Sequence, residues 1–114
     1  MTAARRALGA AGEARAAAWY RANGYDVLHR NWRCARGELD LVVRRGRELV
    51  FVEVKTRRTD RFGTPAEAVT RDKQRRLRSL AFRYLDETGH RAGTLRFDVV
   101  SILGGQLDVI QAAF

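Results

Sequence analysis

Three residues on two neighbouring segments have the side chains needed for metal-assisted hydrolysis. Glu53 and Lys55 lie two residues apart at the end of the apolar segment Leu49-Val50-Phe51-Val52, and Asp40 interrupts the apolar run Leu39-Asp40-Leu41-Val42-Val43. Because side chains alternate along a strand, Glu53 and Lys55 share a face with Leu49 and Phe51. The Glu-x-Lys spacing alone also fits a strand that leaves the core and ends in a surface ion pair. Asp40 favours a functional site over a surface ion pair, since a charge inside an apolar strand is costly unless it is paired or bound to a metal.

The length of the turn between the two segments decides whether Asp40 faces Glu53. A loop with an even number of residues puts Asp40 on the face of Glu53 and Lys55, whereas an odd loop without a bulge puts it on the other face. With a four-residue loop over residues 45–48, Asp40 would lie opposite Glu53 with their Cβ atoms about 5 Å apart. A divalent cation would relieve the repulsion between these carboxylates, and their hard oxygen ligands suit Mg²⁺ or Mn²⁺. Lys55 would then orient the attacking water and offset charge on a phosphate.

The scarcity of lysine adds weight to this set. Twenty of the 22 basic residues are arginines, and only Lys55 and Lys73 are lysines. A planar guanidinium does not replace a compact ammonium, so a retained lysine hints at a specific need. Lys73 falls within a helical apolar stripe formed by Ala66, Val69, Leu77, Leu80, Ala81 and Tyr84. Two interpretations are open: its head extends to solvent past the core, or it reaches the acidic cluster or a bound phosphate.

Other charged residues are weaker candidates. Glu13, the only acidic residue in the first expected helix, is either a third metal ligand or an exposed partner of an arginine. Glu38 either supplements the metal site or pairs with Arg33 or Arg57, and Arg96 is expected to pair with Asp98. Arg71, Arg75 and Arg78 form either a solvated helix face or a contact to a nucleic-acid backbone. The residues expected to contact nucleic acid are Lys73, Arg33, Arg57 and Arg71.

Composition limits the classes of protein. A chain of 114 residues allows one domain, residues 1–114, and excludes a multidomain enzyme. No apolar run is long enough for a membrane span or a signal peptide, so we expect a cytoplasmic protein without a membrane partner. The 22 basic and 13 acidic residues give a net charge of +9. Such an excess on a small body favours a polyanionic partner, with nucleic acid ahead of membranes.

Local patterns predict the elements that position these residues. We expect a helix over residues 2–23, ended by Gly24, and strands over residues 25–32, 38–43 and 49–55. The capping box Thr64-Pro65-Ala66-Glu67 predicts a helix from residue 64 to about residue 87. Strands over residues 94–102 and 106–110 follow, joined by Gly104-Gly105. The predicted fold class is α/β, a mixed β-sheet flanked by helices in the order α-β-β-β-α-β-β, with a parallel crossover through the second helix.

Several motifs in this order resemble the YraN-like family of uncharacterised bacterial proteins. The motifs are Gly12-Glu13, Gly24-Tyr25, Arg30-Asn31-Trp32-Arg33, Gly37-Glu38-Leu39-Asp40-Leu41, Phe51-Val52-Glu53-Val54-Lys55-Thr56-Arg57, Phe62-Gly63, Ala66-Glu67-Ala68-Val69, Lys73 and Arg96-Phe97-Asp98-Val99-Val100. The resemblance places the chain in the PD-(D/E)XK nuclease superfamily, near the Holliday-junction resolvases, and implies a restriction-endonuclease-like core. It implies that Asp40 is the metal-binding aspartate, that Glu53 and Lys55 are the Glu-x-Lys pair, and that Glu13 is the acidic residue on the first helix. Resolvase relatives also suggest a homodimer.

Three functions are therefore compared. The first is a magnesium-dependent endonuclease acting on DNA, including branched or structured DNA, with Asp40, Glu53 and Lys55 as catalytic residues. The second is a catalytically silent nucleic-acid-binding module or subunit, and the third is a structural partner that binds ribosomal RNA or an acidic protein. Two apposed carboxylates favour the first function, because they would repel phosphate in a protein that only binds nucleic acid.

Overall fold

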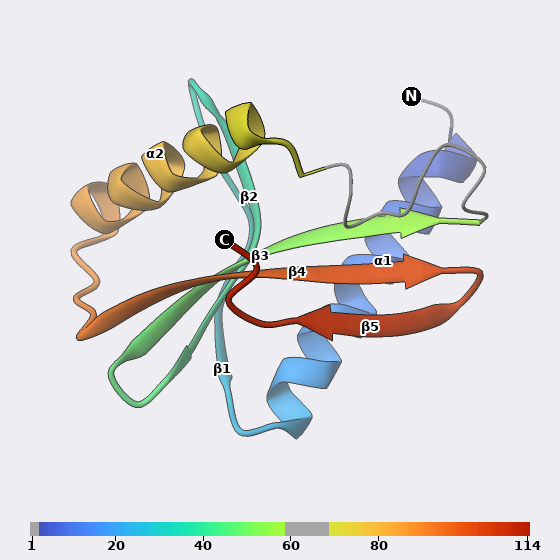
Figure 1. Ribbon diagram of the computed structural model, residues 1–114, viewed down its shortest axis with the longest axis horizontal. Coiled ribbons are helices and arrows are strands. Elements are labelled where there is room, and N and C mark those ends of the chain that lie inside the picture. The colour runs from blue at the N-terminus through green and yellow to red at the C-terminus, as the bar shows by residue number, and fades with distance from the viewer. Residues whose placement is uncertain (1–2, 59–68) are drawn as a thin grey trace.

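The computed structural model describes residues 3–58 and 69–114 (Figure 1). The elements, in chain order, are α1 (Ala3–Ala22), β1 (Asp26–Cys34), β2 (Gly37–Arg45), β3 (Glu48–Arg57), α2 (Arg71–Thr88), β4 (Thr94–Leu103) and β5 (Gln106–Ile110). This is the predicted α-β-β-β-α-β-β order.

Glycines in left-handed backbone conformations end or join several elements. Gly24 follows α1 with φ of 87°, and Gly46 turns β2 into β3 with φ of 61°. Gly104 and Gly105 have φ of 57° and 84° in the turn between β4 and β5. Residues with a Cβ rarely adopt such values, and two successive positive φ angles suit a two-residue hairpin turn. These positions confirm the turns expected from the sequence.

The five strands form one mixed sheet in the order β1-β2-β3-β4-β5. The β3 and β4 strands are parallel, as predicted for a crossover through α2, and the other neighbouring pairs are antiparallel. The α1 helix packs on Val50 and Val52 of β3, whereas α2 packs on Leu49 and Phe51. The sheet therefore has a helix on each face (Figure 1). The side-chain alternation predicted for β3 is confirmed, and Glu53 lies on the α2 face.

The second helix begins later than predicted. Residues 64–68, which carry the expected capping box, lie outside the described residues, while Val69 and Thr70 are not helical. Thr70 is extended, with φ of −71° and ψ of 169°, and its hydroxyl accepts a hydrogen bond from the Lys73 backbone N–H. A continuous helix from residue 64 to residue 87 is therefore wrong, because Thr70 is the N-cap and α2 begins at Arg71.

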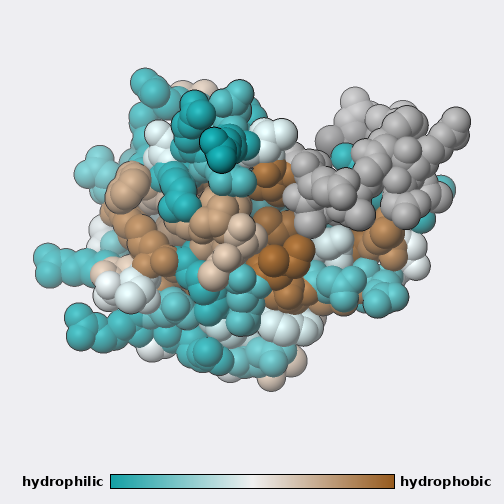
Figure 2. All heavy atoms as spheres, viewed as in Figure 1, coloured by the Kyte–Doolittle hydropathy of each residue, from teal (hydrophilic) through white to brown (hydrophobic). Residues whose placement is uncertain are grey.

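The surface combines charged and apolar regions. Figure 2 shows hydrophilic side chains over much of one face and apolar residues gathered near its middle. Across the described residues, Phe82 on α2 and Ile110 on β5 are the exposed large apolar side chains. No helix within the described ranges is long and apolar enough to cross a membrane.

Candidate functional site

Both lysines of the chain contact the same carboxylate oxygen. Lys73 Nζ lies 2.9 Å from Glu53 Oε1, and Lys55 Nζ lies 3.3 Å from the same atom. The Glu53 side chain is 7% exposed, whereas both lysine side chains are 24% exposed. Of the two interpretations of Lys73, the structure supports the one in which its head reaches the acidic cluster. The Glu-x-Lys pair is buried at its carboxylate and therefore differs from an ordinary surface ion pair.

The β2–β3 hairpin brings Asp40 to this cluster. Arg45 pairs with Glu48 and Leu41 with Val52, so the turn contains Gly46 and Arg47. The turn has two residues instead of the four considered from the sequence. Both numbers are even, so the register of the strands is the same, and Arg45 and Glu48 form one additional pair. Paired residues end at Leu41 and Val52, and the next position along each strand is Asp40 and Glu53. The parity argument therefore places Asp40 correctly on the side of Glu53.

The Asp40 side chain accepts a backbone hydrogen bond from the neighbouring strand. Its Oδ2 accepts a hydrogen bond of 2.9 Å from the Val54 backbone N–H. A carboxylate here takes the place of a strand carbonyl at the point where β2 leaves β3. This contact fixes the orientation of Asp40 and was not predicted, because side-chain alternation says nothing about which backbone group a carboxylate caps.

The electrostatic environment favours a protonated Asp40. Burial, followed by the charge of Glu53, raises the pKa of Asp40 to about 7, although the hydrogen bond from Val54 opposes the increase. The carboxyl groups of Asp40 and Glu53 therefore repel each other when both are ionised. A proton on Asp40 or an added cation would reduce this repulsion.

The two lysines respond differently to the cluster. Burial, followed by contact with Lys73, lowers the pKa of Lys55. The pKa of Lys73 is raised: burial is the largest influence and acts downwards, but contacts with Lys55 and Glu53 and the charge of Asp40 outweigh it. Lys73 is thus the fixed ammonium of the pair, and Lys55 is the one whose proton is held less tightly.

Glu13 on α1 influences the cluster through its charge. That charge contributes to the raised pKa of Asp40, after burial and Glu53. Within residues 3–58 and 69–114, no three histidine, cysteine, aspartate or glutamate side chains gather closely enough to hold a metal ion. Asp40 and Glu53 are therefore the carboxylate pair on which a metal site would rest, and ligation by Glu13 stays a prediction.

The arginines expected to contact nucleic acid differ in exposure and in partners. Arg33 Nε lies 3.0 Å from Glu38 Oε2, with side chains 75% and 46% exposed, which settles the open pairing of Glu38. Arg57 is half-buried at the end of β3, and Arg71 is exposed at the start of α2. Arg78 is not simply a solvated cation, because its guanidinium stacks 4.9 Å from the centre of the Phe97 ring.

A second charged cluster lies on the opposite face of the sheet. Arg96 and Asp98 form the predicted pair, with Arg96 Nε 2.9 Å from Asp98 Oδ1. Asp98 Oδ2 also accepts a hydrogen bond of 2.6 Å from the Tyr20 hydroxyl, and Arg96 Nη1 lies 2.7 Å from Glu48 Oε1. The contact to Tyr20 was missed, since its partner is 78 residues away and no local spacing signals it.

Comparison with known proteins places these motifs in one family. A model described as "Uncharacterised protein family UPF0102" matches residues 12–102. A UPF0102 protein of Beutenbergia cavernae is 56% identical over 100 residues, which cover 88% of this chain and 85% of the relative. A UPF0102 protein of Rhodococcus opacus is 49% identical over 113 residues, covering 95% of this chain and 96% of the relative. A UPF0102 protein of Moorella thermoacetica is 49% identical over 102 residues, which cover 90% of this chain and 85% of the relative. The chain therefore belongs to the uncharacterised protein family UPF0102, the YraN-like family that its motifs resemble.

Proposed function

We propose that this protein is a magnesium- or manganese-dependent endonuclease that hydrolyses phosphodiester bonds in DNA, including branched or structured DNA. The observation that carries the proposal is the buried pair Asp40 and Glu53, with both lysines of the chain on Glu53 Oε1. In a protein that only binds nucleic acid, two adjacent carboxylates would repel the phosphates. In a hydrolase the same two carboxylates can hold a metal cation beside a lysine.

The donor set fits a hard divalent cation. Asp40 and Glu53 supply carboxylate oxygens, which Mg²⁺ and Mn²⁺ prefer. The raised pKa of Asp40 supports this fit, because burial and the charge of Glu53 oppose its ionisation. When bound, the cation would stabilise negative charge on phosphate and make water a better nucleophile.

The chain's own groups would orient the reactants. Lys73 remains an ammonium and holds Glu53 in place across the 2.9 Å contact. Lys55 lies two residues after Glu53 on the same face of β3 and has a lowered pKa. Its ammonium group can orient an attacking water or donate to a phosphate oxygen. The hydrogen bond from Val54 keeps the Asp40 carboxylate directed at the same point.

The net charge of +9 supports a nucleic-acid substrate. Arg33 and Arg71 are exposed and Arg57 is half-buried, so their cationic side chains are candidates for phosphate contacts. Such contacts release counterions, so binding should weaken steeply as salt increases.

A nucleic-acid-binding module without cleavage is the second candidate. It is favoured by the two lysines on Glu53, since these ammonium groups balance the carboxylate charge without a metal ion. In this case the cluster would be a structural ion network, and the basic surface would carry the whole function.

The deciding experiment is a cleavage assay on linear, flapped and four-way DNA and on RNA, with magnesium or manganese. The full chain is compared with Asp40→Asn and Lys55→Ala, for which we expect rates at least about 100-fold lower. Asp72→Asn is the matched control, because Asp72 is a 90% exposed carboxylate whose partner is Arg75.

The outcomes separate the two candidates. Cleavage that survives in both site variants would indicate a contaminating nuclease and remove the assignment. Absence of cleavage on every substrate, with salt-sensitive binding retained, would favour the binding module.

A further inference from the structure

We propose that the outer face of α2 binds an unpaired strand of nucleic acid and that the ring of Phe82 stacks on one of its bases. The outer face consists of Arg71, Arg75, Arg78 and Phe82, which are all exposed. It lies opposite the buried side of α2, which packs on the sheet. The inference rests on the proposed function in taking nucleic acid as the partner, and it adds a preference for substrates with unpaired nucleotides.

Phe82 is the most exposed large apolar side chain within residues 3–58 and 69–114. It is 64% exposed, whereas Ile110 is 39% exposed. A ring with a free face can stack on a nucleobase of any sequence. Single apolar residues are common on protein surfaces, so the assignment depends on the groups that surround Phe82.

Helical spacing aligns three arginines with Phe82. Residues 71, 75, 78 and 82 are separated by four, three and four positions, which places them in one row along an α-helix. At 1.5 Å per residue, this row is about 16 Å long. The exposed Asp86 lies one turn further along and ends the row, because it would repel phosphate. A row of cations that leads to an exposed ring suits a nucleic-acid strand, whose phosphates contact arginines while a base stacks on the ring.

The cations of α2 are available to a polyanion. Within the described residues, Arg71 makes no hydrogen bond or ion pair. Arg75 Nη1 lies 3.4 Å from Asp72 Oδ1, but these side chains are 76% and 90% exposed. Such an exposed pair contributes little free energy, so a phosphate can replace the carboxylate.

Arg78 is held in place by aromatic rings. Its guanidinium lies 4.9 Å from the centre of the Phe97 ring and 5.4 Å from that of Phe114. Stacking orients the guanidinium but uses none of its N–H donors, which have no acceptor within the described residues. Arg78 can therefore bind phosphate without first losing another hydrogen bond.

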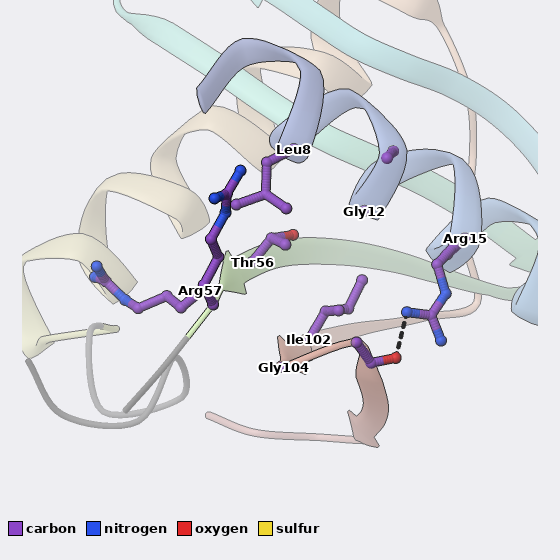
Figure 3. A pocket seen from close by; sticks show the side chains of 10 residues that line it. Leu8, Gly12, Arg15, Thr56, Arg57, Ile102 and Gly104 are labelled. Carbon is purple, nitrogen blue, oxygen red and sulfur yellow. Dashed lines mark hydrogen bonds between the residues drawn. The ribbon is translucent and has the colours of Figure 1, made fainter. Parts of the chain in front are cut away.

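The arginine that α1 holds against the sheet is different, because it is already engaged. Figure 3 shows Arg15 of α1, whose Nη1 donates a 2.6 Å hydrogen bond to the Gly105 carbonyl. Gly12 approaches β3 so closely that a Cβ there would collide with Thr56 Oγ1. At this point α1 is fitted to the sheet, whereas the outer face of α2 is open to a partner.

The first turn of α2 connects the outer face with the carboxylate–lysine cluster. Lys73 follows Arg71 by two residues and contacts Glu53 Oε1 on the inner side of the helix. A strand that leaves the cluster can therefore pass Arg71 and continue along the outer face to Phe82. Stacking on Phe82 requires a base without a partner, as in a flap or at a junction, because the bases of a duplex are paired inside it.

The test is fluorescence polarisation of the full chain with labelled DNA strands of about 12 nucleotides, in EDTA so that no cleavage occurs. A thymidine strand is compared with an abasic strand of the same length, which keeps the phosphates but lacks the bases. We expect the thymidine strand to bind at least about fivefold more tightly. Phe82→Leu should remove this preference, because leucine is apolar but has no ring, and Phe82→Tyr should retain it.

Matched variants assign each effect to the outer face. Arg71→Gln should weaken both strands by about threefold and lower the salt dependence of binding. Arg76→Gln is its control, since Arg76 is also exposed and without a partner within the described residues, but lies about a third of a turn away from the row. Ile110→Ala is the control for Phe82. The melting temperatures of the Phe82 variants should equal that of the parent chain, because the ring is exposed.

Three results would overturn the proposal. The first is an unchanged preference for bases in Phe82→Leu, and the second is an equal loss of that preference in Ile110→Ala. The third is Phe82-dependent competition by polyglutamate as strong as that by the thymidine strand, because the face would then bind an acidic protein.

The result is separate from the test of cleavage. A preference for bases that depends on Phe82 supports the outer face even if no substrate is cut, and only the nuclease proposal would then fail. Cleavage by a chain without that preference would have the opposite meaning, since the nuclease proposal would stand and the role of Phe82 would not.

Discussion

Two neighbouring parallel strands each carry an acidic and a basic residue two positions apart, yet the two pairs have different surroundings. On β4, Arg96 and Asp98 face α1, and Asp98 is fully buried with hydrogen bonds from Arg96, the Tyr20 hydroxyl and the Ala112 backbone N–H. On β3, Glu53 and Lys55 face α2, where a second carboxylate, Asp40, adds negative charge. The same spacing thus occurs in one closed network and in one cluster whose second carboxyl group, Asp40, has a raised pKa.

The difference shows how to separate structural ion pairs from candidate sites in this fold. Asp98 is matched by donors on every side, and its bond to Arg96 is the first cause of a raised pKa for that guanidinium. Asp40 instead has a pKa raised to about 7, while the side chains of Lys55 and Lys73 are each 24% exposed. The cluster with the raised carboxyl pKa and the partly exposed lysines is the one that can exchange a proton or a cation.

Removal of the closed network should have the largest effect on stability. Asp98→Ala leaves Arg96 and the Tyr20 hydroxyl without their buried partner, so we expect the free energy of unfolding to fall by about 3–5 kcal/mol. Urea denaturation at pH 7 measures this change. Glu53→Gln is the comparison variant and should cost less stability than Asp98→Ala, because glutamine keeps an oxygen near the two lysines and removes a charge that raises the pKa of Asp40. Equal losses in the two variants would mean that the clusters are equivalent.

Asp40→Asn should stabilise the chain at high pH. Between the ordinary aspartate pKa of 3.8 and the raised value of about 7, the folded chain holds a proton that the unfolded chain has released. Stability therefore decreases as pH rises through this window, and the cost persists above it. Asparagine avoids the charge and keeps an oxygen for the Val54 N–H, so we expect a gain of about 1–3 kcal/mol at pH 8 and none at pH 4.

Denaturation curves of both proteins at pH 4, 6 and 8 check this expectation. Parallel behaviour of the variant and the parent chain across the series would show that Asp40 is ionised without cost.

Cation binding should depend on the same proton. If Asp40 and Glu53 hold Mn²⁺, a proton competes for Asp40 below its pKa of about 7. The apparent dissociation constant should then rise about tenfold for each pH unit below 7 and level off above pH 8. Calorimetric titration from pH 5.5 to 8.5 measures the profile, and Glu53→Gln should abolish the signal. A flat profile would remove Asp40 from the metal site.

The smallest effect is expected at the exposed ion pair of the β1–β2 hairpin. Arg33 and Glu38 are 75% and 46% exposed, so Arg33→Gln should alter the free energy of unfolding by less than about 0.5 kcal/mol. Its effect on nucleic-acid binding should be larger, with a shallower dependence of affinity on salt. An unchanged salt dependence would exclude Arg33 from the nucleic-acid contact.

The sequence alone predicted much of the carboxylate–lysine cluster because short-range rules govern it. Strand alternation placed Glu53 and Lys55 together. The sequence left open the parity of the turn and the direction of Lys73, and the observed even turn and the contact of Lys73 with Glu53 decide both. Each of these residues is positioned by the geometry of one hairpin or one helix face.

Other features depend on contacts that no local pattern encodes. The capping box at residue 64 obscured the N-cap at Thr70, since both segments contain a threonine followed by helix formers. The bond between Tyr20 and Asp98 and the approach of Gly12 to Thr56 require the packing of α1 on the completed sheet. A glycine within an alanine-rich helix was the available signal for that close approach.

The hydrogen bond from Val54 to Asp40 has a spectroscopic consequence. Because this backbone N–H donates to a carboxylate instead of a strand carbonyl, its proton resonance depends directly on the charge state of Asp40. The amide belongs to a central strand and needs no attached probe. An NMR titration that follows Val54 would thus read protonation or ion binding at the cluster in the absence of any substrate.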